Sequence, residues 1–305
     1  MAPQKRTAEE ADALLEGIQV LLLDIEGTTT PISFVKDKLF PYVRENVETY
    51  LTNHFAEEEC VGDVTALREL AAKDVADGVE GAVAIPGAES PQDAVVKAVV
   101  DSVGWQMNQD RKSTALKQLQ GHIWREAYKQ GKVKGELFDD VAPAIKQLVE
   151  DGKKVYIYSS GSTEAQKLLF AHSTEGDLSE SLTGYFDTNV GSKTESDSYK
   201  KISEEVGVKP EEILFLTDIP QEASAAVKAG MKSQLVVRPG NAALTEDDKK
   251  NFPYIESFDE LLGAEDGTKK LAPGEEGDAD GDQEADDANG DGDEAEAVEG
   301  EESNQ

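Results

Sequence analysis

The amino-acid sequence predicts an α/β protein in which a helical domain interrupts a parallel sheet. Three observations lead to this prediction. Short apolar runs alternate with helical patterns along much of the chain, residues 36–131 show helical periodicity with almost no strand signal, and the apolar runs end in polar residues.

The predicted strands are short runs rich in leucine and β-branched residues. Their length and the turn residues beside them are typical of strands that are buried on both faces of a sheet. They are IQVLLL at 18–23, KVYIY at 154–158, ILFLT at 213–217 and QLVVR at 234–238.

Helical patterns lie between the later strands, as parallel strands require for their crossover connections. One helix is expected to end at Gly152 and another at Gly230, because glycine commonly follows the last turn of a helix. The apolar residues at helical spacing are Val141, Ile145 and Leu148, and further helices are expected at 162–171, 197–206 and 221–229.

Residues 36–131 form a different kind of sequence. Apolar residues recur at three- and four-residue spacing in about four groups, with a loop-like stretch at 78–90. We therefore expect an N-terminal extension at 1–16, an α/β core made of 17–35 and 132–263, a helical cap at 36–131 and an acidic disordered tail at 264–305.

The chain has a formal net charge of −33, and this charge is unevenly distributed. Residues 271–305 contain fifteen acidic and no basic residues, so that residues 1–270 carry a net charge of −18. The tail has too few apolar groups to offset its ordering entropy, so we expect it to be disordered and to contact basic partners. The acidic balance argues against binding to nucleic acid or to anionic membranes.

Cysteine use and the lack of long apolar runs indicate a soluble, intracellular protein. The single cysteine, Cys60, cannot form an internal disulfide, which fits a reducing compartment. The N-terminal residues lack the apolar region of a secretion signal, and the longest apolar runs are far shorter than the roughly 20 residues that span a bilayer. We expect a cytoplasmic location, with the nucleus as a second one, and a monomer, although the sequence carries no direct signal of oligomeric state.

Polar residues follow three of the predicted strands, and a lysine lies in a loop ahead of a predicted helix. In open parallel sheets, ligands bind beyond the carboxyl ends of the strands, so these side chains are expected to meet at one site. They are Asp24, Glu26, Ser159, Ser160, Lys193 and Asp218.

This set of side chains suits the chemistry of phosphate monoesters. Mg²⁺ prefers oxygen ligands and often takes only one or two carboxylates, for which Asp24 and Asp218 are candidates. Asp24 also suits nucleophilic attack on phosphorus, which forms an aspartyl-phosphate. Ser159 and Lys193 suit the phosphoryl oxygens, and Glu26 suits protonation of the leaving oxygen.

Each of these residues alone has a simpler explanation. Serines before a helix commonly cap it, and an isolated lysine or aspartate is commonly solvated or part of a turn. The combination in this order, with the acids and serines at strand ends, favours a functional site.

The histidines and tryptophans carry no comparable signal. The histidines are far apart without metal-ligand spacing, and the tryptophans fall on helical stretches, so we expect surface or packing roles for His54, His122, His172, Trp105 and Trp124.

The site residues resemble the four motifs of the haloacid dehalogenase superfamily: Asp24-x-Glu26-Gly-Thr, a serine at a strand end, a loop lysine and a final strand-end aspartate. Over roughly residues 17–262, the chain resembles more closely the enolase-phosphatase, or acireductone synthase, family of methionine salvage. Glutamate at position 26, where the superfamily's phosphatases usually carry aspartate, supports this narrower match. The matching segments are LLLDIEGTTTPISFVKDKLFPYV, KQLQGHIW, VYIYSSGSTEAQKLLF, HSTEGDL and LFLTDI.

The resemblance implies a Rossmann-like core with an inserted helical cap, which agrees with the pattern of the sequence. It implies one Mg²⁺ bound through Asp24, the backbone carbonyl of Glu26, and Asp218. It also implies catalytic roles for Asp24 and Glu26, and substrate contacts at Ser159, Ser160 and Lys193. The implied reaction is the enolisation of 5-(methylthio)-2,3-dioxopentyl phosphate, followed by hydrolysis of its phosphate to give the acireductone.

The sequence leaves two mechanistic points and two alternative functions open. It does not identify the base for enolisation, which could be a lysine, a glutamate or a metal-bound oxygen, nor whether one Mg²⁺ serves both steps. Another capped, Mg²⁺-dependent phosphatase would share these motifs. A binding protein with an acidic tail and a vestigial site is the remaining alternative, and the intact Asp24, Lys193 and Asp218 argue against it.

Overall fold

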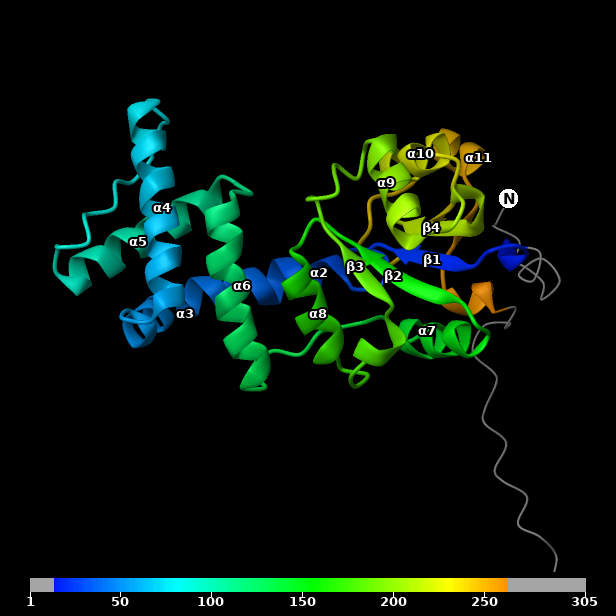
Figure 1. The fold of residues 1–305 in the computed structure, drawn as a ribbon, viewed down its shortest axis with the longest axis horizontal. Helices are drawn as coiled ribbons and strands as arrows, with labels where there is room; N and C mark the ends of the chain where they lie inside the picture. The colour runs from blue at the N-terminus through cyan, green and yellow to red at the C-terminus, as the bar shows by residue number, and fades with distance from the viewer. Residues whose placement is uncertain (1–13, 263–305) are drawn as a thin grey trace, which may run out of the picture. The chain divides into compact units, whose positions relative to one another are not determined.

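The computed structural model describes residues 14–262, and all elements below belong to this part of the chain. Six parallel strands form one sheet in the order β3-β2-β1-β4-β5-β6. The predicted α/β fold with a parallel sheet is therefore confirmed. Strands β1, β2, β3 and β4 are labelled in Figure 1. The strands are β1 (Val20–Leu23), β2 (Lys154–Tyr158), β3 (Gly184–Phe186), β4 (Ile213–Thr217), β5 (Lys232–Val236) and β6 (Tyr254–Ile255).

The helices follow the predicted alternation closely. A short helix and a π-helical segment lead into the inserted helices, and the later helices connect the strands of the sheet. The helices are α2 (Ile32–Phe34), η1 (Val35–Leu39), α3 (Phe40–His54), α4 (Glu58–Ala76), α5 (Gln92–Asn108), α6 (Thr114–Lys129), α7 (Val141–Glu150), α8 (Thr163–Ala171), η2 (Ser179–Ser181), α9 (Ser196–Val206), η3 (Pro210–Glu212), α10 (Pro220–Lys228), α11 (Glu246–Asn251) and η4 (Phe258–Leu261).

Sequence patterns misplaced one strand and missed two. The strand predicted at 234–238 is Lys232–Val236, because Lys232 and the polar Ser233 pair with β4, where the Ser233 hydroxyl donates a hydrogen bond to the Phe215 carbonyl at 3.1 Å. Strands β3 and β6 were missed because they contain three and two residues. Such short runs have no periodicity of their own and are defined by pairing with β2 and β5.

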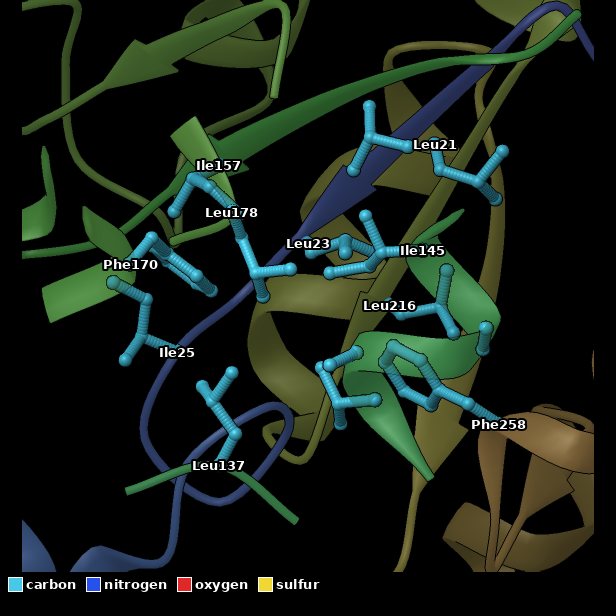
Figure 2. Close-up of a cluster of buried hydrophobic side chains, with 14 of the residues drawn as sticks. Leu21, Leu23, Ile25, Leu137, Ile145, Ile157, Phe170, Leu178, Leu216 and Phe258 are labelled. Atoms are coloured by element: carbon cyan, nitrogen blue, oxygen red, sulfur yellow. The ribbon is translucent and has the colours of Figure 1, made fainter. Parts of the chain in front are cut away.

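Alternating side chains of the strands pack against helices on both faces of the sheet. On one face, Leu21 and Leu23 of β1 belong to a buried cluster with Ile145 of α7 and Phe170 of α8 (Figure 2). On the other face, Leu22 belongs to a cluster with residues of α9 and α10, among them Tyr199 and Ala226. Burial on both faces explains why the strands read as continuous apolar runs.

The inserted helices α3, α4, α5 and α6 have an apolar core of their own. Its fully buried members include Val43, Leu67, Val99 and Leu119, one from each helix. No strand occurs within residues 36–131, all of which the structure describes, as predicted. The apolar residues that recur at helical spacing in this segment are therefore the ones buried in its core.

The domain boundaries drawn from the sequence stay predictions. All described residues belong to one compact unit, Met1–Thr268, which does not separate cap from core. The predicted tail at 264–305 and most of the predicted extension at 1–16 lie outside the described residues. Within the described range, no helix has both the length and the apolar composition to cross a membrane.

A buried ion pair joins two helices of the cap. His122 of α6 places its Nδ1 2.7 Å from Asp63 Oδ2 on α4, and its Nε2 lies 3.3 Å from Glu59 Oε1. Asp63 is fully buried. Burial opposes the charged imidazolium, but Asp63 and Glu59 favour it more strongly and raise the pKa of His122 above its usual value. His122 thus has the packing role expected from the sequence, and it also neutralises a buried carboxylate.

We predict that His122→Ala destabilises the protein by about 3–5 kcal/mol, because it leaves the Asp63 carboxylate buried without its partner. Because the folded-state pKa is raised, the stabilisation from protonated His122 is complete below about pH 6.5 and is lost as the pH rises through the raised pKa. Urea unfolding at pH 6 and pH 9 measures both effects. The control His54→Ala removes a more exposed cap histidine and should cost less than about 1 kcal/mol. Equal losses for the two variants would contradict this account.

Candidate active site

Three neighbouring strands end at one edge of the sheet and bring the predicted residues together. Strand β1 lies between β2 and β4, so Asp24, Ser159 and Asp218 follow adjacent parallel strands. All three side chains are buried, with 5%, 6% and 8% exposure. The site lies beyond the carboxyl ends of the strands, where parallel sheets bind their ligands.

Lys193 reaches this edge from the loop ahead of α9. Its Nζ lies 2.6 Å from Asp24 Oδ1 and 2.7 Å from Glu222 Oε2, and the aromatic rings of Tyr158 and Phe215 lie 5.7 and 6.0 Å from the same atom. Burial disfavours the charged ammonium, but the two carboxylates outweigh burial and hold the pKa of Lys193 above its usual value. Lys193 is therefore a buried cation shared by two acids.

The two carboxylate oxygens of Asp24 have different surroundings. Oδ1 accepts hydrogen bonds from the Lys193 ammonium and, at 2.7 Å, from the backbone N–H of Ile25. Among the described residues, Oδ2 has a single hydrogen-bond contact, at 3.3 Å, with the hydroxyl of Thr217. This hydroxyl also lies 2.9 Å from Glu222 Oε2. Oδ2 is thus the oxygen left available for a ligand or for nucleophilic attack.

Asp218 forms no ion pair within residues 14–262, and the nearby charge of Lys193 only partly offsets the effects that raise its pKa. Burial, followed by the negative charges of Asp24 and Glu222, raises its pKa to about 7. Its Oδ1 is buried and has no hydrogen-bond partner among the described residues. Three carboxylates thus surround one ammonium, and a bound cation would reduce the cost of burying them.

The loop after β1 brings its backbone close to Asp218. Gly27 has φ +77°, and a Cβ there would collide with Asp218 Oδ2 and lie 2.9 Å from Asn241 Oδ1. Within residues 14–262, no hydrogen bond reaches the carbonyl of Glu26. The described residues contain no cluster of three or more histidine, cysteine and acidic side chains arranged for a metal. Two carboxylates and a carbonyl nevertheless suit Mg²⁺, which commonly completes its shell with water and substrate phosphate.

A cavity of about 310 Å³ adjoins this site. Glu26, Ser159 and Ser160 line its polar side, and burial together with the charge of Asp24 raises the pKa of Glu26 above its usual value. The Glu26 side chain is exposed and lines the cavity. The remaining lining comes largely from apolar side chains, including Val35, Leu39, Phe40, Met107, Leu116 and Trp124, and from the cationic Arg44, Arg111, Lys112 and Lys117.

The serine segment, residues 159–162, follows β2. One of its serines caps a helix, and the others lie at the candidate site. Ser162 caps α8 by accepting a hydrogen bond from the Ala165 N–H at 3.2 Å, so the simple explanation holds for this serine. Ser159 is buried, and its Oγ accepts from the Gly161 N–H at 3.2 Å. Ser160 is exposed, and its carbonyl accepts from Lys117 Nζ at 3.1 Å. Lys117 of α6 thereby fixes the backbone of this segment.

Several residues of the site escaped the sequence reasoning. Glu222 could have been recognised as an acid four residues after Asp218, on the first turn of α10. The cationic residues of the cap gave no such signal, because each is far in sequence from the strand ends. Asn241 follows β5 by five residues, but a single asparagine after a strand gives no chemical signal of its own. Trp124 packs as predicted, but it also lines the cavity.

Comparisons with known proteins agree with this geometry. Residues 18–230 match the haloacid dehalogenase-like hydrolase family. The chain is 56% identical over 246 residues to enolase-phosphatase E1 of Xenopus tropicalis, covering 80% of this chain and 94% of the relative. It is 54% identical over 270 residues to enolase-phosphatase E1 of Branchiostoma floridae, covering 84% and 89%.

A solved structure extends the agreement to the fold. The crystal structure of the UTR4 protein of Saccharomyces cerevisiae aligns with a TM-score of 0.62 at 32% identity, covering 79% of this chain and 98% of that chain. The chain therefore belongs to the haloacid dehalogenase-like hydrolases and, within them, to the enolase-phosphatase E1 family.

Proposed function

We propose that this protein is a Mg²⁺-dependent enolase-phosphatase that converts 5-(methylthio)-2,3-dioxopentyl phosphate to the acireductone and phosphate in methionine salvage. The observation that carries this proposal is the state of Asp24. It is buried at the sheet edge with Oδ1 held by Lys193 and Oδ2 available, beside a cavity lined by Glu26. The high identity to enolase-phosphatases along most of the chain supports the substrate.

Asp24 and Glu26 would divide the work of phosphate hydrolysis. Asp24 Oδ2 attacks phosphorus to form an aspartyl-phosphate, while Glu26 gives its proton to the departing ester oxygen. Glu26, now a carboxylate, then accepts a proton from the water that attacks the aspartyl-phosphate and releases phosphate. The raised pKa of Glu26 favours its first role, because burial and the charge of Asp24 stabilise the protonated form relative to an ordinary glutamate.

Lys193 and the serines would position the phosphoryl group. The Lys193 ammonium holds Oδ1 of Asp24 and offers a donor to a phosphoryl oxygen, and Ser159 and Ser160, which follow the neighbouring strand β2, offer hydroxyl groups. Asp24, the Glu26 carbonyl and Asp218 would hold the Mg²⁺, which when bound neutralises negative charge on the phosphoryl group.

The cavity suits the remainder of the proposed substrate. Its volume lies at the lower end of the range for small-molecule sites. Side chains such as Phe40, Met107 and Trp124 suit the methylthio-alkyl chain, and Arg44 and Lys112 suit the oxygen-rich dione. The expected monomer, the cytoplasmic and nuclear locations and the basic partners of the tail stay predictions.

The reaction itself is the first test of this proposal. The purified chain should release phosphate from the dioxopentyl phosphate and form a transient enol absorbance when Mg²⁺ is present. EDTA should abolish phosphate release, and added Mg²⁺ should restore it, because the carboxylate-rich site favours a hard cation. Phosphate release without the enol absorbance would indicate a different capped phosphatase, and rescue by zinc alone would refute the choice of metal.

We further predict that Asp24→Asn lowers the rate of phosphate release by roughly four or more orders of magnitude, as loss of a covalent nucleophile does. The amide keeps the shape of the side chain but provides neither a nucleophile nor a good Mg²⁺ ligand. Single-turnover phosphate release measures the effect. Asp177→Asn, an exposed aspartate that accepts a hydrogen bond from the Ser179 N–H, is the matched control and should keep full activity. Activity of Asp24→Asn within tenfold of the parent would exclude the covalent mechanism.

A further inference from the structure

The segment that follows β5 contacts the loop that carries the catalytic residues. Asn241 Nδ2 donates hydrogen bonds to the Gly27 carbonyl at 2.9 Å and to the Val236 carbonyl at 3.3 Å. Three residues earlier, Arg238 Nε donates to the Thr28 carbonyl at 3.2 Å. The carbonyls of Gly27 and Thr28 lie in the catalytic loop, residues 24–30. Both accept hydrogen bonds from one short segment, residues 238–241.

This segment is itself firmly anchored. Arg238 is 7% exposed and forms an ion pair with Asp140 at 2.7 Å. Its guanidinium carbon lies 4.4 Å from the ring centre of Phe138 and 5.3 Å from that of Phe258. The Asn241 N–H donates to the Arg238 carbonyl at 3.1 Å, which closes the segment into a turn. Asn241 is therefore a fixed donor and not a side chain that samples many positions.

Gly27 is the point of the loop that most needs such a donor. Glycine at positive φ can rotate its flanking peptide groups more easily than other residues can. The peptide group between Glu26 and Gly27 is held because the Gly27 N–H donates to the Thr30 carbonyl at 2.8 Å. The peptide group between Gly27 and Thr28 is held by the hydrogen bond that its carbonyl accepts from Asn241 Nδ2.

Asn241 and Asp218 both approach the loop at Gly27. Asn241 Oδ1 is buried without a hydrogen-bond partner among the described residues, as is Asp218 Oδ1. Both side chains approach the bare Cα of Gly27, where a Cβ would meet Asp218 Oδ2 and Asn241 Oδ1. The Asn241 side chain and the Asp218 carboxylate therefore both lie against Gly27, in the loop that carries Asp24 and Glu26.

We propose that Asn241 is a positioning residue for the Mg²⁺ site: by holding the Gly27 carbonyl, it keeps the Glu26 carbonyl and Asp218 in place to bind the cation. This inference rests on the Mg²⁺ site of the proposed function. Residues that orient metal ligands without touching the metal typically contribute 10–100-fold to metal affinity. Asn241 has the fixed geometry and the position for that role.

The test is direct Mg²⁺ binding by calorimetry on the full-length chain, without substrate. Asn241→Ala should weaken Mg²⁺ affinity about 10–100-fold. The matched control is Asn46→Ala, which removes a similar amide-to-carbonyl hydrogen bond, 2.8 Å to Tyr42 in the cap, and should stay within threefold of the parent. In EDTA, Asn241→Ala should melt within a few degrees of the parent, and Mg²⁺ should then raise its Tm less than it raises that of the parent.

Two results would overturn the inference. The first is an Mg²⁺ affinity of Asn241→Ala within threefold of the parent. The second is a large loss of Tm in EDTA, which would mean that Asn241 supports the fold in general. If the alanine variant does not fold, Asn241→Leu preserves the size of the side chain and gives the same measurement, and failure of both variants to fold also refutes the positioning role. A parent that binds no Mg²⁺ contradicts the metal site, whereas a parent that binds Mg²⁺ but does not turn over the dioxopentyl phosphate contradicts only the proposed function.

Discussion

The contact of the Lys193 ammonium with Asp24 is the interaction on which the candidate site depends. Burying a carboxylate without a partner is costly, and this sheet edge buries Asp24, Asp218 and Glu222 close together. Lys193 compensates two of these charges, at 2.6 and 2.7 Å, and holds one oxygen of Asp24 while the other stays available. Asp218 has no such partner among the described residues, which makes this edge receptive to a cation; burial, followed by the charges of Asp24 and Glu222, raises the pKa of that carboxyl group.

The order of the strands makes this concentration of charge possible. With β1 between β2 and β4, the residues that follow three parallel strands must end side by side. The chain after β1 then folds into a tight loop, in which the Ile25 carbonyl accepts hydrogen bonds from the N–H groups of Thr28, Thr29 and Thr30 at 3.1, 3.0 and 2.9 Å. The segment after β5 binds the same loop through Arg238 and Asn241. The catalytic loop is therefore fixed from within and from the far side of β4, so that its acids do not depend on a ligand for their placement.

The inserted helices contribute a different kind of chemistry. Their own apolar core and the pair of His122 with Asp63 hold these helices together. Their contribution to the cavity is mainly apolar and cationic, whereas the residues that follow the strands contribute acids and hydroxyl groups. Lys117 and Arg125 of α6 also contact the serine segment, at the Ser160 carbonyl, and the start of α8, at Glu164. In this arrangement the sheet edge holds the reacting groups, and the helices shape the space for the rest of the substrate.

Local patterns in the sequence were sufficient for the long strands, the four inserted helices and the residues placed directly at strand ends, including Asp24, Ser159 and Asp218. These features depend on periodicity, on turn residues and on the rule that parallel strands end together, all of which can be recognised within a few residues. Only the tertiary structure decided that Lys193 pairs with Asp24, 169 positions away, that Glu222 shares the same ammonium, and that Asn241 holds Gly27. The same holds for the short strands β3 and β6 and for the cationic lining of the cavity. The reason is physical: each of these features is created by contact between segments distant in the chain, and such contacts leave no periodic trace in either segment alone.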